Sequence, residues 1–250
     1  VSLIFSVCLL CFVVFITLYR SIISMIISFL GQKGGTGKSS VARAVAVEFV
    51  RSGWSVHVAD MDTIQKTIFN WAGRRDDAEI EPALEVALYR EPKAALKAAD
   101  ISDLLVIDGK AFADAHLLTV AKASDLIVIP VGVNADDLEP TLNLATELIN
   151  KGISRASMLF VVDKVPDNGE REAMDTRQTI KNWAFNVSQG YIPFKTAYSQ
   201  AMDAGRTLSE TKYKGLNEKT DKIIQQIVDA AINTQDKKLN RGVAIFAKAC

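Results

Sequence analysis

Short apolar runs alternate with longer stretches of helical periodicity along most of the chain. The apolar runs predict strands over residues 26–30, 55–60, 104–108, 125–131, 158–163 and 186–192. The periodic stretches predict helices near residues 39–52, 81–99, 111–123, 136–151, 170–184, 196–205 and 214–233. Nearly continuous apolar strands separated by helices are typical of a parallel sheet buried on both faces. We therefore expect an α/β fold over residues 25–234, with a doubly wound, mostly parallel sheet and helices on both faces.

The two ends of the chain depart from this alternation. Residues 1–19 carry no charge and are mostly apolar, and at about 1.5 Å of rise per residue such a helix spans a bilayer core. A membrane anchor is therefore one interpretation of residues 1–24. The other, which we favour, is that they lie upstream of the true start, because Met25 is the first methionine and no basic region precedes the apolar run. Residues 235–250 begin with a polar run, and we expect a loosely packed tail there.

Composition narrows the classes of protein that this chain can be. Its 29 basic and 29 acidic residues cancel, so any surface that binds nucleic acid must be local rather than global. An apolar content of 49% excludes wholesale disorder. The three cysteines are Cys8, Cys11 and Cys250, so the body of the chain has neither a disulfide framework nor a thiolate metal site. That usage fits a reducing cytoplasm.

A glycine-rich loop between the first strand and the first helix carries the most specific chemistry. Residues 31–40 read GQKGGTGKSS and satisfy G-x-x-x-x-G-K-[ST], the phosphate-binding P-loop. Glycines let successive backbone N–H groups approach phosphate oxygens, and the following helix adds its N-terminal dipole. Lys38 is expected to reach the β- and γ-phosphates, and Ser39 to place its hydroxyl on Mg²⁺. The predicted nucleotide-binding residues of the loop are Gly34, Gly35, Thr36, Gly37, Lys38, Ser39 and Ser40.

A second lysine, Lys33, precedes the glycines, although a P-loop needs only Lys38. The stretch KGGTGKS after the first strand, followed by D-x-D at the end of the second, resembles the ParA/MinD family of ATPases, whose P-loop is called a deviant Walker A motif. The resemblance implies a P-loop fold, ATP and Mg²⁺ as cofactors, and an ATP-dependent homodimer. In that dimer Lys33 would reach across to the nucleotide of the partner subunit, so Lys33, Lys38 and Asp62 are the predicted catalytic residues.

Carboxylates close two of the predicted strands. Asp60 and Asp62 end the second strand, where side chains face the ligand crevice of a parallel sheet. The resemblance implies that Asp62 positions the hydrolytic water, but the family's D-x-D-P-Q reads DMDTIQ here, so Thr63 replaces proline and Gln65 comes one residue later. Asp108 ends the strand LLVID, a Walker B pattern, and is expected to contact Mg²⁺ through water.

The residues after the fifth strand are expected on the base side of the nucleotide. Asp163 and Lys164 stand where family members flank the adenine, so the resemblance implies that one of them has this role. Residues 192–201 are similar to the family's I-P-R stretch, with Lys195 in place of the usual arginine.

Basic residues gather in the last third of the chain. Lys195, Lys214, Lys219 and Lys222 are the predicted DNA-binding residues, and Lys219 and Lys222 are spaced to share one helix face. Lysines on a dimer would neutralise phosphates without reading the base sequence. Acidic residues interleave with them, so an ordinary solvated helix face is the alternative interpretation.

The resemblance implies a ParA-type partition ATPase that is cytoplasmic and associated with the nucleoid. It would dimerise on ATP, bind DNA non-specifically, and hydrolyse ATP slowly when a ParB-like partner stimulates it, so as to segregate plasmid or chromosome cargo. The alternative is a MinD-like positioning ATPase at the membrane, which would become anchored there if residues 1–24 are translated. Iron-protein relatives would need cysteines in the body of the chain, and tyrosine-kinase-like relatives a tyrosine cluster after Tyr213.

Overall fold

A computed structural model describes residues 24–110 and 115–249, and describes side chains up to residue 240. The predictions made for residues 1–23 lie outside the described residues. Within these ranges, no helix has both the length and the apolar character needed to cross a membrane.

A seven-stranded parallel sheet runs through the middle of the molecule, in the order β3-β2-β4-β1-β5-β6-β7. The strands are β1 (Met25–Phe29), β2 (Val56–Asp60), β3 (Glu85–Leu88), β4 (Leu104–Asp108), β5 (Leu126–Val131), β6 (Met158–Val162) and β7 (Asn186–Val187). Because all neighbours are parallel, every strand ends at the same edge of the sheet. The loops that follow β1, β2, β4 and β6 therefore meet at this edge.

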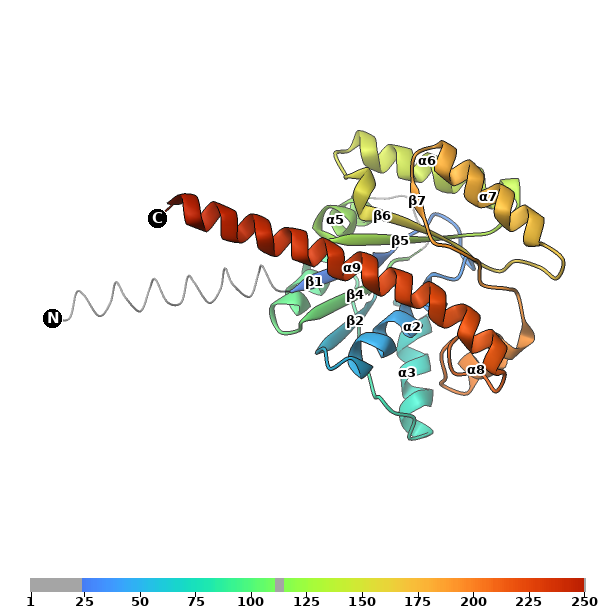
Figure 1. The fold of residues 1–250 in the computed structure, drawn as a ribbon. Coiled ribbons are helices and arrows are strands. Elements are labelled where there is room, and N and C mark those ends of the chain that lie inside the picture. The colour runs from blue at the N-terminus through green and yellow to red at the C-terminus, as the bar shows by residue number, and fades with distance from the viewer. Residues whose placement is uncertain (1–23, 111–114, 250) are drawn as a thin grey trace.

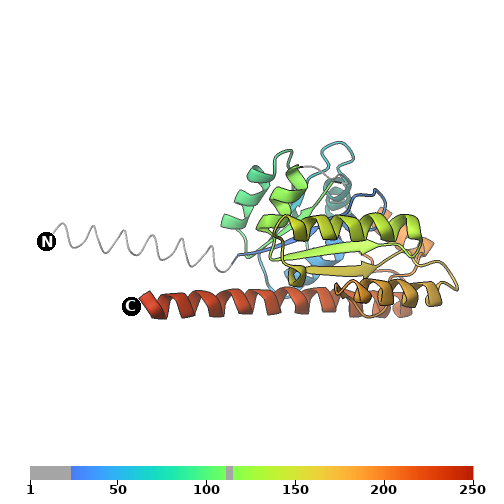
Figure 2. The same ribbon diagram turned by 90° about the horizontal axis from the view of Figure 1, so that it is seen from above.

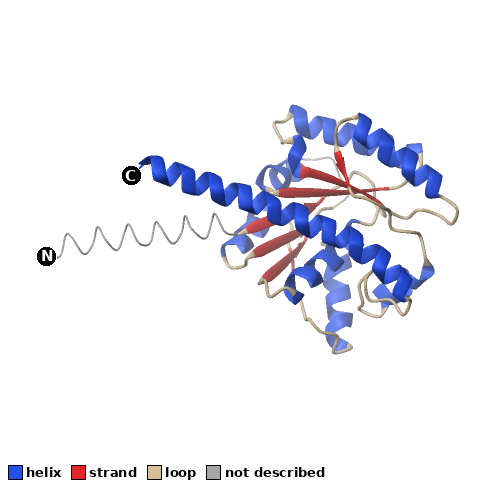
Figure 3. Ribbon diagram, in the orientation of Figure 1, coloured by secondary structure: helices blue, strands red, loops and turns tan. Residues whose placement is uncertain are grey.

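Helices cover both faces of the sheet, as the strands between helices in Figures 1 and 3 show. They are α2 (Lys38–Arg51), α3 (Thr67–Asp77), α4 (Pro92–Leu96), α5 (Ala115–Ala123), α6 (Ala135–Asn150), α7 (Glu170–Asn182), α8 (Thr196–Asp203) and α9 (Lys214–Ala249), with 3₁₀ turns at Lys97–Asp100 and Arg155–Ser157. The predicted doubly wound α/β fold is confirmed.

The alternation of side chains along β1 divides the core into two layers. Met25, Ile27 and Phe29 pack with α2 and α9 on one face, whereas Ile26 packs against the cluster that includes residues of α5, α6 and α7 on the other. Figures 1 and 2 show α9 lying along the sheet and extending past the beginning of β1. The last helix therefore closes the layer that begins with the first strand.

Four segments differ from the sequence expectation. The prediction of a helix over 81–99 is wrong, because this segment contains strand β3, the short helix α4 and a 3₁₀ turn. Helix α3 was not predicted, and the strand predicted over 186–192 is only two residues long. Helix α9 continues to Ala249, so most of the expected tail is helical.

Candidate nucleotide-binding site

The P-loop forms a turn between β1 and α2 at the carboxyl edge of the sheet. Gly35 and Gly37 have left-handed backbone angles, with φ of 77° and 92°, which a glycine adopts without strain. A Cβ atom built on Gly34 or Gly35 would have no described atom within 4 Å. The loop thus presents open backbone beside the N-terminus of α2, the arrangement that binds phosphate.

Lys38, the first residue of α2, points into its own loop. Its Nζ donates to the carbonyl of Lys33 at 2.7 Å. Burial lowers the pKa of Lys38, while the carboxylates of Asp108 and Asp62 act to raise it. The amine therefore lies within the electrostatic reach of both acidic strand ends.

The next side chain along, Ser39, meets the end of β4. Its hydroxyl donates to Asp108 Oδ2 at 2.5 Å. Asp108 is 4% exposed, and its other oxygen, Oδ1, has no hydrogen-bond partner among the described residues. Burial raises the pKa of Asp108 to about 7, against the effect of the Ser39 hydrogen bond. A hydroxyl, an unsatisfied carboxylate oxygen and a phosphate-binding loop fit Mg²⁺, which prefers oxygen ligands and retains waters. Ser39 and Asp108 would hold the ion, which supplies charge neutralisation at the phosphates.

Asp60 fixes the turn that carries Asp62. Its Oδ1 accepts from the amide of Asp62 at 3.0 Å, and its Oδ2 accepts from the amides of Ile68 and Phe69 at 2.9 and 3.2 Å in the first turn of α3. Asp60 is fully buried, and burial raises its pKa while these hydrogen bonds lower it. The structure therefore assigns Asp60 the role of an anchor between β2 and α3.

Asp62 lies in the turn itself. Its Oδ1 accepts from the amides of Ile64 and Gln65 at 3.1 and 3.0 Å, which stabilises the turn. Position 63 is threonine rather than proline, so these two hydrogen bonds to the Asp62 carboxylate shape the turn. Gln65 meets the Asp62 carboxylate through its backbone amide.

Lys33 reaches across the loop edge to another element of the same chain. Its Nζ lies 3.1 Å from Oδ1 of Asp137, in the first turn of α6. Asn134 holds that carboxylate by donating from Nδ2 to Oδ2 at 3.1 Å. Lys33 and Asp137 are 104 residues apart in sequence. The sequence around Asp137 predicted only the start of a helix, so it did not indicate a contact with Lys33.

Asp163 and Lys164, the two residues after β6, also contact the P-loop. Oδ2 of Asp163 lies so close to Gly37 that a Cβ built there would be 1.6 Å from it. The neighbouring Lys164 donates from Nζ to the carbonyl of Gly35. Burial raises the pKa of Asp163 to about 7, and Lys164 acts to lower it. Asp163 and Lys164, predicted on the base side, are thus brought together with the phosphate loop.

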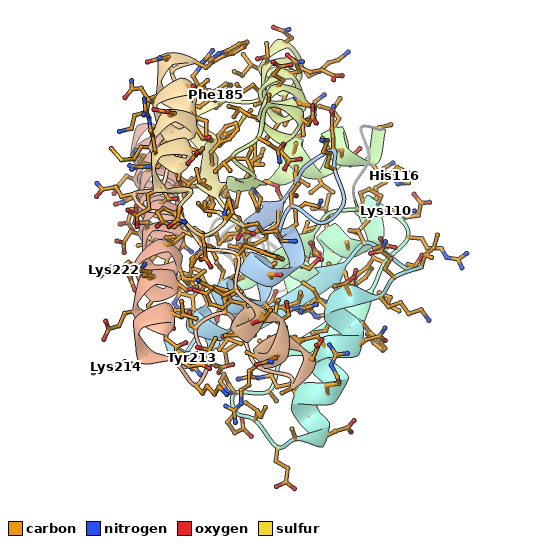
Figure 4. The ribbon with its side chains drawn as sticks, turned by 90° about the vertical axis from the view of Figure 1, so that its right-hand side faces the viewer. Lys110, His116, Phe185, Tyr213, Lys214 and Lys222 are labelled. Carbon is orange, nitrogen blue, oxygen red and sulfur yellow. The ribbon has the colours of Figure 1, made fainter. Side chains whose placement is uncertain are left out.

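The four lysines predicted to bind DNA lie around α8 and along α9, and Lys195 lies beside the loop that follows β6. Lys195 pairs with Asp167, and Lys214 lies 3.8 Å from Glu218. The Nζ atom of Lys219 lies 6.0 Å from the centroid of the Tyr191 ring. Figure 4 shows Lys214 and Lys222 along α9, across the view from Lys110 at the end of β4.

Two adjoining hollows of about 630 and 540 Å³ run beside α9, and Lys219 lines both. Lys222 lines the larger hollow and Lys195 the smaller. Three of the four lysines therefore line one or both of these hollows, whereas Lys214 is among the lining residues of neither.

The fold and the glycine loop define a P-loop nucleotide-binding protein. The family model of the CobQ/CobB/MinD/ParA nucleotide binding domain matches residues 27–208, and the chain belongs to that family. A search of curated proteins gives no significant match.

Three solved structures of similar fold are each distant from this chain in sequence. The cell division ATPase MinD of Pyrococcus furiosus gives a TM-score of 0.66 at 18% identity, covering 83% of this chain and 100% of that one. MinD of Pyrococcus horikoshii OT3, solved with Mg-ADP, gives 0.63 at 17% identity, covering 82% and 96%. A ParA family ATPase from Chlorobium tepidum TLS gives 0.57 at 17% identity, covering 79% and 97%.

Proposed function

We propose that the protein hydrolyses ATP in a Mg²⁺-dependent homodimer and uses the cycle to position or segregate cargo. The observation that carries this proposal is the meeting of three features at one edge of the sheet. These are the open P-loop with Lys38, the Ser39–Asp108 pair, and the Asp62 turn. Each supplies a function that phosphoryl transfer to water requires: phosphate binding, metal binding and orientation of the nucleophile.

Catalysis would consist of positioning and charge stabilisation. Lys38 would leave the carbonyl of Lys33 for the β- and γ-phosphates. The free oxygen of Asp62 would accept a hydrogen bond from the attacking water and hold it in line. Lys33 of the partner subunit would add positive charge as the bond to the γ-phosphate breaks, as arginine fingers do in other phosphoryl transfers.

Substitutions separate these roles. Lys38→Ala is expected to abolish nucleotide binding, measured with a fluorescent ATP analogue. Asp62→Ala is expected to keep ATP-dependent dimerisation and to lower turnover by tenfold or more. Lys33→Ala should leave nucleotide affinity nearly unchanged while it weakens the dimer. Unchanged turnover in Asp62→Ala would remove the water-positioning role from this proposal.

For the cargo, we infer a ParA-type partition role in the cytoplasm, on the nucleoid, with a ParB-like stimulating partner. Support comes from the two hollows beside α9, where Lys195, Lys219 and Lys222 could neutralise duplex phosphates. The alternative is MinD-like action at a membrane, which the P. furiosus structure and the apolar residues 1–19 favour.

DNA binding distinguishes the two roles. Duplex DNA is titrated with ATP, ADP or no nucleotide at two salt concentrations, using the full chain and a version that begins at Met25. Partition activity predicts binding that requires ATP and falls steeply with salt. Lys219→Glu and Lys222→Glu should weaken it by tenfold or more, whereas Lys151→Glu, just after α6, should not. Binding to anionic vesicles but not to DNA would favour the membrane role.

A further inference from the structure

Arg43 is a buried cation close to the candidate site that no motif explains. It lies on α2 one helical turn after Ser39 and is 5% exposed. Its Nη2 donates to the carbonyl of Thr67, the first residue of α3, at 2.8 Å. The guanidinium also lies over the ring of the fully buried Trp71, 5.2 Å from its centroid. Arg43 therefore links the P-loop helix to the helix that follows the Asp62 turn.

The turn that carries Asp62 is fixed at both ends. At its start, the amide of Met61 donates to the carbonyl of Asp108 at 3.1 Å, and Asp60 holds the amide of Asp62. At its end the turn enters α3, whose first residue is held by Arg43. Asp60 also holds this first turn of α3, through the amides of Ile68 and Phe69. The hydrogen bond of Arg43 adds the link from this turn to the P-loop helix.

The cost of burying this charge argues against a purely structural role. Arg43 Nε has no hydrogen-bond partner among the described residues. Burial lowers the pKa of Arg43 to about 10, so the side chain remains cationic at neutral pH, and Asp108 and Asp60 act to raise it. An apolar side chain would fill such a place at less cost in free energy, because desolvating a charge is unfavourable.

We propose that Arg43 is a positioning residue for ATP hydrolysis: it holds the Asp62 turn at a fixed place relative to the P-loop helix that bears Ser39. This inference rests on the proposed function, because it assigns Arg43 an effect only through Asp62. The described hydrogen bond of Arg43 goes to Thr67 rather than to the P-loop or Asp62, and Arg43 acts on Asp108 only through charge. Its loss should therefore affect the chemical step and leave the affinity for nucleotide intact.

The test compares Arg43→Gln and Arg43→Lys with Arg51→Gln, a control on the same helix whose side chain pairs with Glu210 at the far end. We measure kcat, KM, the affinity for a fluorescent ATP analogue, and thermal unfolding for each full-length variant. Arg43→Gln is expected to lower kcat by tenfold or more, with nucleotide affinity within about twofold. Arg43→Lys keeps the charge but loses the planar fork, so it should recover part of the rate. Arg51→Gln should leave kcat unchanged.

The double variant Arg43→Gln with Asp62→Ala decides whether the effect passes through Asp62. If it does, the double variant is no slower than Asp62→Ala alone, because residues that act as a unit are not additive. A further slowing by the full factor of Arg43→Gln would overturn the inference, and so would an Arg43→Gln variant with unchanged kcat. If Asp62→Ala itself turns over normally, the proposed function fails first and Arg43 loses its role with it. A variant that loses nucleotide affinity and kcat together would show a structural role only.

Discussion

At the scale of single residues, the lysine that distinguishes this P-loop has a partner within its own chain. The Lys33–Asp137 pair is half-exposed, with 41% and 25% of the two side chains accessible. Such pairs contribute about 0.2–1 kcal/mol. In the proposed homodimer, Lys33 could not hold Asp137 and the nucleotide of the partner subunit at once, so the ion pair would compete with dimerisation.

This competition gives a prediction for Asp137→Asn. Removing the carboxylate frees Lys33, so ATP-dependent dimerisation should become about two- to fivefold tighter, as measured by analytical ultracentrifugation. Asp136→Asn, at the adjacent position, is the matched control and should leave the dimer unchanged. A weaker dimer in Asp137→Asn would mean that the carboxylate holds Lys33 in its productive place instead.

Asp163 gives a second prediction, for the pH dependence of stability. Burial raises its pKa from 3.8 to about 7. The folded state therefore binds a proton that the unfolded state releases between these values, and the stabilisation present below about pH 4 is lost as the pH rises through 7. Asp163→Asn removes this loss, so at pH 8 it should be more stable than the parent by about 1–3 kcal/mol in urea unfolding. The difference in unfolding free energy between Asp163→Asn and the parent should disappear near pH 4. A difference that persists at pH 4 would contradict the raised pKa of Asp163 as its cause.

At the scale of elements, the loop between β1 and α2 depends on glycine at specific positions. Gly37 combines a φ of 92° with the close approach of Asp163, whereas Gly34 has open space around its Cα. Gly37→Ala should lower the free energy of unfolding by about 1–3 kcal/mol, because the backbone is strained and the Asp163 carboxylate must move. Gly34→Ala is the matched control, with an expected change below about 0.5 kcal/mol. Chemical denaturation of both variants measures the difference.

The strong elements were predictable from sequence because their patterns are local. β1, β4, β5 and β6 are continuous apolar runs, and the P-loop is a contiguous motif. The structure of segment 81–99 was not predictable, because its strand β3 has only four residues and is stabilised by pairing with β2. Helix periodicity in that segment was a coincidence of side chains, which tertiary pairing overrides.

The site shows the same division. Lys38, Ser39 and Asp108 were predictable because motif and strand end place them together. The partners Asp137 and Arg43 were not, since one meets Lys33 and the other Thr67 only after the sheet has brought distant segments into contact. Long-range pairs of polar residues leave no periodic signal in a single sequence.

At the scale of the whole molecule, a buried ion pair between Arg75 and Glu210 joins helix α3 to the segment that precedes α9. Arg75 of α3 is fully buried and donates to both carboxylate oxygens of Glu210 at 2.8 and 3.0 Å. It also donates to the carbonyls of Gly205, Glu81 and Pro82 at 3.0, 2.9 and 2.9 Å. A single guanidinium thus ties α3 to the loop after it and to the segment before α9.

Breaking this pair should destabilise the entire fold. Glu210→Gln leaves Arg75 buried without its counter-charge, and the expected loss is about 3–5 kcal/mol of unfolding free energy. Glu218→Gln, in the exposed pair with Lys214, should cost less than about 0.5 kcal/mol. Urea denaturation of the two variants checks the contrast; equal small losses would show that hydrogen bonds to carbonyls hold Arg75 on their own.

The position of β1 has a consequence for how the protein is made. This strand emerges first from the ribosome, yet it pairs with β4 and β5, which follow some 80 and 100 residues later, and α9 at the other end of the chain covers it. A chain synthesised from its N-terminus can therefore place β1 in the sheet only after β4 has appeared, and the cover that α9 provides forms only after α9 has been synthesised. Until then, of the two helices that cover Met25, Ile27 and Phe29, only α2 can shield these apolar side chains, and we expect the nascent chain to expose surface of the kind that chaperones bind.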